Sequence, residues 1–402
     1  MRRRDVLAGL PWVALASPAA AATPPKKLIV VIANGGWDPT MALDPKIGVD
    51  GIAGGLPDED LGDPLDRETT AVIGAIDIAH NPVKRPAVAQ FFENWGAYAT
   101  VVRGLYTSSL SHVPCMDRTL MGRGMADLAT TFGAMGAWTP FGAVDLSAMA
   151  RPGPWPDRVS RLGTQGQISW LVDPATEPAA TGATVSTRSA GPLTQAALDA
   201  ATTARLARLD AAWGGWGVTQ RNQLADAQRQ AAALREAAPD TSRNTTLQLD
   251  LMTTVELMSS GLATAALVDS RATWDTHAEA GKMHGSYNRL FIALGTLMNE
   301  LTLRGLRDDT LVCVLSELGR TPWRNDELGT DHWPWTAALL MGGGLPGDRV
   351  IGATDDGLTG LPVDLSTGDV TDAGETLQLE ALTGGILQAL GIGDDGPNLQ
   401  LT

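Results

Sequence analysis

Runs of consecutive apolar residues predict the buried strands of this chain. Continuous aliphatic and β-branched runs without polar alternation are typical of strands that are buried on both faces of a parallel sheet. A further short candidate lies inside a segment rich in Pro, Gly, Ser and Thr, about 140–192, which predicts a loop-rich excursion. The main runs lie at residues 28–33, 99–102, 311–315 and 337–341, and the short candidate at residues 168–172.

Segments rich in Ala, Leu, Gln and Arg predict helices between these strands. The segment 286–306, the turn Arg307-Asp308-Asp309 and the strand 311–315 form a helix–turn–strand unit, which is typical of α/β folds. We therefore expect an α/β protein with a doubly wound, mostly parallel sheet between helices. We expect one domain over 23–402, with a loop-rich and helical insertion or cap at about 140–240. The helices are expected at about 115–122, 193–237, 246–267, 286–306 and 375–390.

Residues 1–22 have the parts of a cleavable export signal. Arg2, Arg3 and Arg4 precede a short apolar stretch that ends in small residues. Arg3-Arg4 resembles the twin-arginine type of signal, and an ordinary secretory signal is the alternative. No later apolar run reaches the roughly 18 residues that a membrane span needs. We expect export to the periplasm or beyond, without a membrane span after signal removal.

Composition limits the class of partner. The 402 residues are 44% hydrophobic, which fits a globular protein with a sizeable core. The net charge of −15 argues against a nucleic-acid partner, because phosphate contacts need clustered Lys and Arg. Cys313 lies within a predicted strand and is expected to be a small core residue, and we predict no disulfide between it and Cys115. The sequence does not indicate an oligomeric state.

Polar and charged side chains are concentrated just after one of the predicted buried strands. The stretch "VLSELGRTPWRNDELGTDHW" runs from Val314 to Trp333 and contains Glu317, Arg320 and Asp331-His332. Ligands gather at the carboxyl ends of the strands in open α/β sheets. This part of the chain is therefore where a site is expected.

Carboxylates and imidazoles occur together at several such places. Asp38 follows the first strand, Asp275 and His277 lie in "TWDTH", and Asp331 and His332 lie in "GTDHW". Carboxylate oxygen and imidazole nitrogen are ligands of zinc, manganese and iron. Asp331 can coordinate an ion itself or orient the neighbouring imidazole through a hydrogen bond. The pattern predicts a divalent metal site.

Each candidate also has a structural explanation. An Asp after Gly-Gly is often a turn residue or a helix cap, which applies to Asp38, and Asp275 or Asp331 can cap a following segment. Glu317 can pair with Arg320, and His284 can face solvent. These alternatives remain open at this point.

A second candidate is the start of a predicted helix in "YTSSLSHVPCMDRTLMGRG". Ser111 and His112 stand where the free amides and the positive end of the helix dipole favour an anion. Ser111 can equally be a simple helix cap. The sequence contains neither a G-x-S-x-G nucleophile elbow nor a P-loop.

These segments, taken in order, resemble a known family. "RRRDVL", "LIVVIANGGWD", "SHVPCMDRTLMG", "WDTH", "DDTLVCVLSELGRT" and "GTDHW" followed by an apolar strand and "GGG" are similar to the exported bacterial family numbered 1501 among the domains of unknown function (DUF1501). The resemblance implies membership of the alkaline-phosphatase and sulfatase superfamily. It also implies one or two metal ions at strand ends beside a nucleophilic Ser, Thr or Cys-derived residue. By resemblance, the metal ligands match Asp38, Asp275, His277, Glu317 and His332.

Two positions depart from the superfamily pattern. The His that usually follows the strand-end acid is replaced by Leu318. The nucleophile position falls on His112, with Ser111 beside it, so that the usual hydroxyl is shifted or absent.

The resemblance and its two departures lead to two alternative functions. The first is a metal-dependent hydrolase of a small anionic phosphate or sulfate ester, in which Ser111 or His112 attacks or positions water and Arg320 neutralises the anionic group. The second is a catalytically weak member of the fold that binds an envelope ligand or partner. Tryptophans that flank the candidate residues are expected either to form a stacking wall for a ring-bearing ligand or to pack the loops: Trp37, Trp274, Trp323, Trp333 and Trp335.

Overall fold

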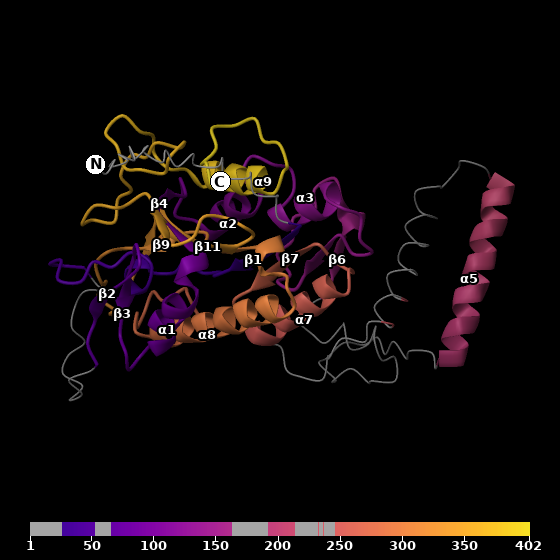
Figure 1. The fold of residues 1–402 in the computed structure, drawn as a ribbon, viewed down its shortest axis with the longest axis horizontal. Coiled ribbons are helices and arrows are strands. Elements are labelled where there is room, and N and C mark those ends of the chain that lie inside the picture. Colours follow the sequence, from indigo (N-terminus) through magenta and orange to yellow (C-terminus); the bar gives the residue numbers. More distant parts are fainter. Residues whose placement is uncertain (1–25, 53–65, 163–191, 214–231, 233–235, 237–245) are drawn as a thin grey trace, which may run out of the picture.

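An eight-stranded sheet forms the centre of the molecule (Figure 1). The structure is a computed structural model, and it describes residues 26–52, 66–162, 192–213, 232, 236 and 246–402. The strand order is β12-β4-β11-β8-β1-β7-β5-β6. The strands are β1 (Lys27–Ile32), β4 (Ala99–Tyr106), β5 (Ala143–Asp145), β6 (Val159–Arg161), β7 (Ala265–Asp269), β8 (Thr310–Leu315), β11 (Trp335–Gly342) and β12 (Arg349–Ile351).

Strand direction decides where the site lies. Every neighbouring pair in the sheet is parallel except the pairs that β11 makes with β4 and β8. The carboxyl ends of β1, β4, β7 and β8 therefore lie at one edge, together with the amino end of β11. The mostly parallel, doubly wound sheet predicted from the sequence is confirmed.

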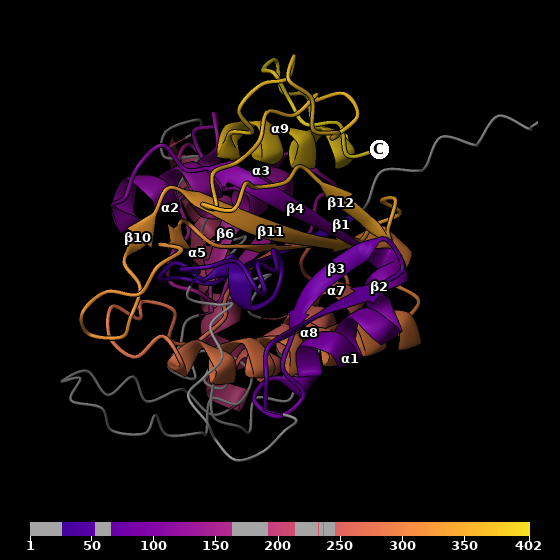
Figure 2. The ribbon, with the colours of Figure 1, turned by 90° about the vertical axis from the view of Figure 1, so that its left-hand side faces the viewer.

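Helices cover both faces of this sheet (Figure 2). In β1, Ile29 and Val31 pack into one apolar cluster, whereas Leu28 and Val30 pack into the other. The first cluster includes residues of α1 (Pro86–Trp95), α7 (Leu247–Ser259) and α8 (Lys282–Leu303). The second includes residues of α2 (His112–Met121), α3 (Leu128–Met135) and α9 (Leu379–Ala389). A run that is apolar at every position is thus explained by burial on two sides.

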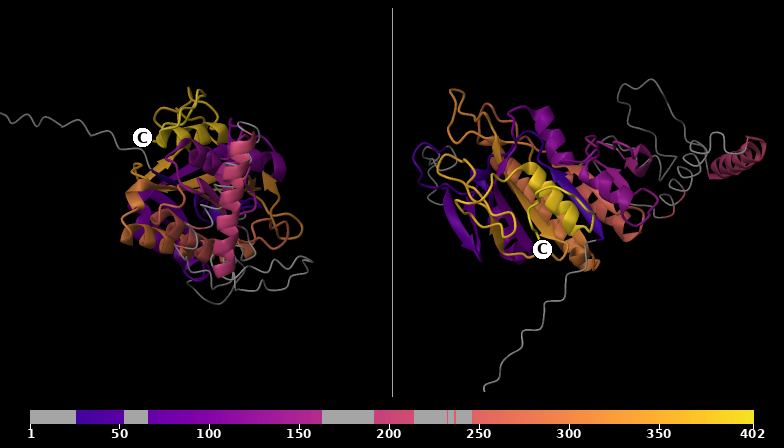
Figure 3. Two further views of the ribbon diagram at one scale, coloured as in Figure 1. Left: turned by 90° about the vertical axis from the view of Figure 1, so that its right-hand side faces the viewer. Right: turned by 90° about the horizontal axis from the view of Figure 1, so that it is seen from above.

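Smaller elements complete the described chain. The hairpin of β2 (Thr69–Ile73) and β3 (Ile76–His80) lies beside α1, and β9 (Gly319–Arg320) pairs with β10 (His332–Trp333). The 3-10 helices are η1 (Pro39–Met41), η3 (Gly96–Tyr98), η4 (Pro156–Arg158) and η5 (Arg307–Asp309). The helix α5 (Pro192–Trp213) stands apart from the sheet and its covering helices (Figure 3). Among the described residues, no helix is both long enough and apolar enough to cross a membrane.

One predicted element is wrong in part. The helix expected over 246–267 ends at Ser259, and residues Ala265–Asp269 form the strand β7. Gly261 adopts a φ of +71°, which ends the helix, and the apolar residues that follow insert between β1 and β5. Cys313 is a buried core residue of β8, as expected, and both thiols are free. The export signal at 1–22, the strand candidate at 168–172 and most of the residues between 214 and 237 lie outside the described residues.

Candidate metal centre

Candidate residues from distant parts of the sequence meet at the edge where the parallel strands end. His112 follows β4, Asp275 and His277 follow β7, and Glu317 follows β8. His332 precedes β11, and it reaches the same edge because β11 runs antiparallel to its neighbours. The structure therefore brings together most of the residues that the sequence singled out.

Three of these side chains form a compact trio of ligand atoms. His277 Nε2 lies 3.0 Å from His332 Nε2 and 3.1 Å from Asp275 Oδ1. His332 Nε2 lies 3.4 Å from the same Asp275 oxygen. For a tetrahedral ion with bonds near 2.0–2.1 Å, neighbouring ligand atoms are about 3.3 Å apart. The trio of Asp275, His277 and His332 therefore fits three corners of a tetrahedral site, with the fourth left for water or substrate.

Hydrogen bonds at the far side of each imidazole fix which nitrogen carries the proton. His277 Nδ1 lies 2.8 Å from Asp331 Oδ1, and His332 Nδ1 lies 2.7 Å from the Leu110 carbonyl oxygen. Both partners are acceptors, so in the neutral imidazoles Nδ1 donates and Nε2 keeps its lone pair. Two such nitrogens that face each other at 3.0 Å beside a carboxylate can share either a proton on one Nε2 or a metal ion bound to both. The residues present therefore fit a metal ion, which would take the place of that proton.

Arg320 holds the carboxylate of the trio. Its Nη2 donates to Asp275 Oδ1 at 2.6 Å, and the guanidinium also donates to the carbonyl oxygens of Gly35, Gly36 and Thr330. Partial burial raises the pKa of Asp275, but Arg320, His277 and His332 together outweigh that effect and leave this pKa below its usual range. Arg320 is fully buried. It was expected to face the anionic group of a substrate, but here it positions Asp275 and three backbone carbonyls.

A second pair lies next to the trio. His112 Nδ1 lies 2.8 Å from Glu317 Oε1, and the same oxygen accepts the Gly35 amide at 2.7 Å. The Glu317 side chain is fully buried, and its Oε2 has no hydrogen-bond partner among the described residues. His112 Nε2 lies 3.7 Å from Asp275 Oδ2. Ligand atoms of His112, Asp275 and His332 all lie within 4.8 Å of one another, so His112 borders the same space.

The histidines of the two groups differ in their electrostatics. The hydrogen bond that His112 donates to Glu317 raises the pKa of His112, whereas burial lowers the pKa of His332. The hydrogen bond with His277 lowers the pKa of Asp331. His332 is therefore favoured in the neutral form that a metal ligand needs.

Asp38 has a different place from the one the resemblance implied. It is the N-cap of η1, and its Oδ1 accepts hydrogen bonds from the Thr40 amide at 3.0 Å and the Thr40 hydroxyl at 2.6 Å. Its own carbonyl oxygen accepts from the Tyr287 hydroxyl at 2.7 Å. Burial raises its pKa from 3.8 to about 6, although the Thr40 hydrogen bonds act in the opposite direction. The structure thus supports the capping explanation that the sequence left open.

The remaining candidates lie around this centre. Ser111 is exposed at the N-cap of α2 and makes no side-chain capping hydrogen bond. Leu318 occupies the position of the missing His and is fully buried, against Gly36. Asp331 is exposed and orients His277.

Asn325 was not singled out from the sequence. Its side-chain amide donates to the His277 carbonyl oxygen at 2.9 Å and to Asp331 Oδ1 at 3.1 Å. The sequence signal for this contact was limited to the position of an Asn between Arg320 and Asp331.

The five tryptophans do not form one wall. Trp37 and Trp274 are buried and pack edge to face in the core. Trp335 packs against the Tyr106 ring. Trp323 is 52% exposed and contacts the Trp333 ring edge to face at 5.3 Å. An aromatic surface is therefore restricted to the Trp323–Trp333 pair, which flanks His332 in the chain.

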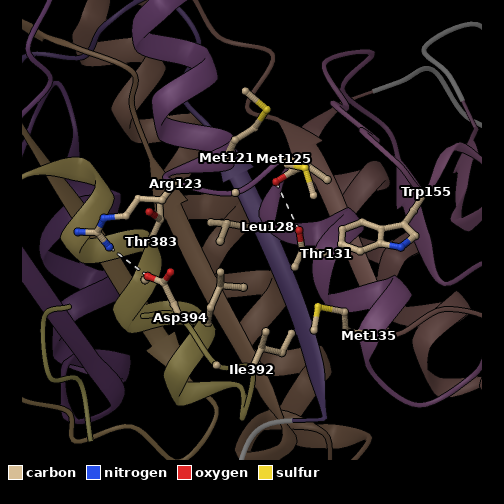
Figure 4. A pocket seen from close by; sticks show the side chains of 15 residues that line it. Met121, Arg123, Met125, Leu128, Thr131, Met135, Trp155, Thr383, Ile392 and Asp394 are labelled. Carbon is tan, nitrogen blue, oxygen red and sulfur yellow. Dashed lines mark hydrogen bonds and ion pairs between the residues drawn. The ribbon is translucent and has the colours of Figure 1, made fainter. Parts of the chain in front are cut away.

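A cavity of about 260 Å³ lies elsewhere (Figure 4). Its wall includes Met121, Met135 and Trp155, and an ion pair of 3.0 Å joins Arg123 to Asp394 at one side. Met121 is the last residue of α2, whereas the first residue of that helix borders the metal centre. A ten-residue helix spans about 15 Å, so this cavity is separate from the centre.

Solved structures with a similar fold were found at low sequence identity. The lipoteichoic acid synthase LtaP from Listeria monocytogenes is 7% identical, with a TM-score of 0.37, over 94% of this chain and 75% of that one. The PsFucS1 sulfatase from Pseudoalteromonas sp. is 10% identical, with a TM-score of 0.34, over 94% and 72%. The phosphonate monoester hydrolase SpPMH from Silicibacter pomeroyi is 12% identical, with a TM-score of 0.32, over 78% and 71%. No curated protein sequence matches the chain.

A family model matches the chain over residues 180–394, which is more than half of its length. The matched segment contains four of the five residues that the resemblance matched to metal ligands: Asp275, His277, Glu317 and His332. The family is described as a protein of unknown function, DUF1501. The chain belongs to the DUF1501 family.

Proposed function

We propose that this protein is an exported, metal-dependent hydrolase of small phosphate or sulfate esters. The observation that carries the proposal is the trio of Asp275, His277 and His332. Its ligand atoms lie 3.0–3.4 Å apart, and partners on the far side of both imidazoles turn Nε2 inward.

The residues of the trio would hold a divalent ion such as zinc, manganese or iron. Nitrogen and carboxylate ligands of this kind suit all three metals. When bound, such an ion polarises an ester oxygen and stabilises the charge that develops on it. Asp331 and the Leu110 carbonyl orient the imidazoles, and Arg320 orients the carboxylate. These supporting contacts keep the ligand atoms in place before a substrate binds.

The location of the activity is part of the proposal. The Arg-rich start of the sequence and the small residues up to Ala22 support export. A twin-arginine route would carry the folded protein with its ion already bound. A small anionic ester outside the cytoplasm is accordingly the proposed class of substrate.

Turnover of simple esters tests the proposal. The mature protein is assayed with aryl phosphate and aryl sulfate esters, with and without a chelator. We expect Asp275→Asn and His277→Ala to lose more than about 100-fold in kcat/KM, because several kcal/mol of charge stabilisation disappear. Asp372→Asn, which changes an exposed carboxylate outside the group, is the matched control. Unchanged turnover in both site variants, with the fold retained by circular dichroism, would refute the proposal.

A binding role without turnover is the second candidate. Leu318 in place of the usual His, and an exposed Ser111 without a hydrogen-bonded base, favour it. It predicts metal binding without hydrolysis of any ester in the screen. Chelator-sensitive turnover by the purified protein would exclude it.

A further inference from the structure

We propose that the ester taken by the metal centre is amphiphilic: its anionic head is held at the trio, and its alcohol carries an alkyl chain. The chain lies on four apolar side chains that are 52–68% exposed. These side chains, Leu110, Val113, Trp323 and Leu328, are called the apolar rim below. The proposal rests on the ester hydrolase function above, and it names the chemical class of the alcohol.

Two members of the apolar rim lie at the start of α2. Val113 directly follows His112 and is the second residue of this helix. Leu110 precedes the N-cap of the helix, and its carbonyl oxygen accepts a hydrogen bond from His332 Nδ1 at 2.7 Å. Since His112 and His332 both border the space at the trio, these two apolar side chains flank the metal centre on the side of α2.

The other two members belong to the segment between β9 and β10. The Trp323 ring contacts the Trp333 ring of β10 edge to face, with centroids 5.3 Å apart. Leu328 forms an isolated antiparallel bridge with Ala278, the residue that follows His277. Both exposed side chains are therefore tied to segments that carry ligands of the trio.

The exposure of Leu328 is fixed by the backbone of its loop. Leu328 has a φ of +59°, which is unfavourable for a leucine. Asn325 Oδ1 accepts from the amides of Glu327 and Gly329, both at 3.0 Å. The Ala280 amide donates to the Leu328 carbonyl oxygen at 3.1 Å, which anchors the loop. A strained backbone that keeps a large apolar side chain in solvent beside a site is typical of ligand contact.

The charges beside the apolar rim favour an uncharged occupant. Asp326 and Glu327 are exposed and directly precede Leu328. The whole chain has a net charge of −15. These carboxylates repel a second anionic group on the ligand, and they also repel an anionic membrane surface. The part of the ligand that lies on the rim is therefore neutral, while the anionic head is confined to the trio.

An alkyl chain on the alcohol fits this place better than a protein partner. A protein seated on all four side chains would cover the corner of the trio that is left for water or substrate. A chain that is bonded to the substrate leaves this corner in use, and it covers the apolar side chains only while the ester is bound. Each methylene that becomes fully buried strengthens binding about 4-fold.

A series of alkyl phosphates tests the proposal. The mature, metal-loaded protein is assayed for phosphate release from ethyl, butyl, hexyl and octyl phosphate, each below the concentration at which it forms micelles. We expect kcat/KM to rise about 2-fold or more with each methylene that reaches the rim, so that octyl phosphate exceeds ethyl phosphate by at least about 10-fold. The same kcat/KM for all four esters would overturn the proposal.

Variants connect the chain selectivity to named side chains. We expect Leu328→Asn and Val113→Asn each to lower the octyl-to-ethyl ratio of kcat/KM at least about 5-fold. Asn is tolerated at positive φ, so the first variant removes the apolar side chain without added strain. Leu303→Asn is the matched control, because Leu303 is exposed at the last residue of α8, about 30 Å from the first residue of that helix. Unchanged ratios in both rim variants, or an equal fall in Leu303→Asn, would overturn the role of the rim.

Vesicles distinguish a substrate chain from a membrane surface. The wild type and the two rim variants are sedimented with phosphatidylcholine vesicles that contain no phosphate monoester. We expect no binding that depends on Leu328 or Val113. Binding that both variants abolish, together with equal kcat/KM across the alkyl series, would assign the rim to a membrane surface and overturn the proposal.

The outcomes distinguish this proposal from the function on which it rests. Chelator-sensitive hydrolysis with the same kcat/KM for every chain length overturns the amphiphilic substrate and leaves the hydrolase function standing. No hydrolysis of any ester by the metal-loaded wild type overturns both.

Discussion

Replacing Asp38 with Asn is expected to change how the stability of the protein depends on pH. The Asp38 side chain is buried, and burial raises its pKa from 3.8 to about 6. Between these values the folded state binds a proton at this carboxyl that the unfolded state does not bind. The free energy of unfolding therefore falls as the pH rises from about 4 to about 6, and it stays at the lower level above that window.

The size of this effect follows from the displacement of the pKa. Each tenfold change in the proton equilibrium corresponds to about 1.4 kcal/mol, so the displacement from 3.8 to about 6 corresponds to about 3 kcal/mol. Asn is neutral at every pH and keeps an oxygen to accept from Thr40. The free energy of unfolding of Asp38→Asn minus that of wild type should therefore increase by about 3 kcal/mol between about pH 4 and pH 7.

Urea unfolding of the chelator-treated protein at several pH values measures this difference. Comparison between the two proteins removes the contributions of groups that titrate equally in both. Asp372→Asn, at an exposed carboxylate, should show a flat difference. A flat or decreasing difference for Asp38→Asn would refute the reasoning that its carboxyl is buried at an energetic cost.

Three further predictions follow from named contacts. Asp331→Ala should weaken metal binding about 10–100-fold in chelator competition, because His277 Nδ1 loses the acceptor that orients the imidazole, and unchanged affinity would contradict this. Trp323→Ala should raise KM about 10-fold for esters of ring-bearing alcohols but not for methyl esters, and an equal change for both would exclude a stacking role. Gly36→Ala should cost about 1–3 kcal/mol more than Gly261→Ala in urea unfolding. Both glycines have φ near +75°, so the backbone strain of an alanine is similar at the two positions. Only at Gly36 would the added Cβ meet a neighbour, Leu318 Cδ1 at 2.0 Å. Equal costs for the two variants would contradict that contact.

Much of the fold follows from local sequence. Runs that are apolar at every position predicted β1 and β8, which pair in parallel and are buried on both faces. The strand β7 was missed because apolar residues resume directly after Ser259-Ser260-Gly261, although that Gly is a helix-ending signal. Its strand conformation depends on pairing with β1, which lies more than 200 residues away in the sequence.

The site was predictable as a set of residues but not as a set of roles. Strand ends meet at one edge of a parallel sheet, so the convergence of Asp275, His277 and His332 could be expected. The roles of the others depend on contacts across the fold. Glu317 bonds His112 rather than joining the trio, and Arg320 is buried beneath Asp275. Local sequence contains no information about such pairings.

Metal content is the measurement that tests the central claim most directly. The mature protein, purified without chelators from an exporting host, is analysed by elemental mass spectrometry. The trio predicts about one equivalent of zinc, manganese or iron, lost in His277→Ala and His332→Ala and retained in His112→Ala. No bound metal, and none taken up on titration, would contradict the account. Equal loss in His112→Ala would contradict the assignment of the ion to the trio alone.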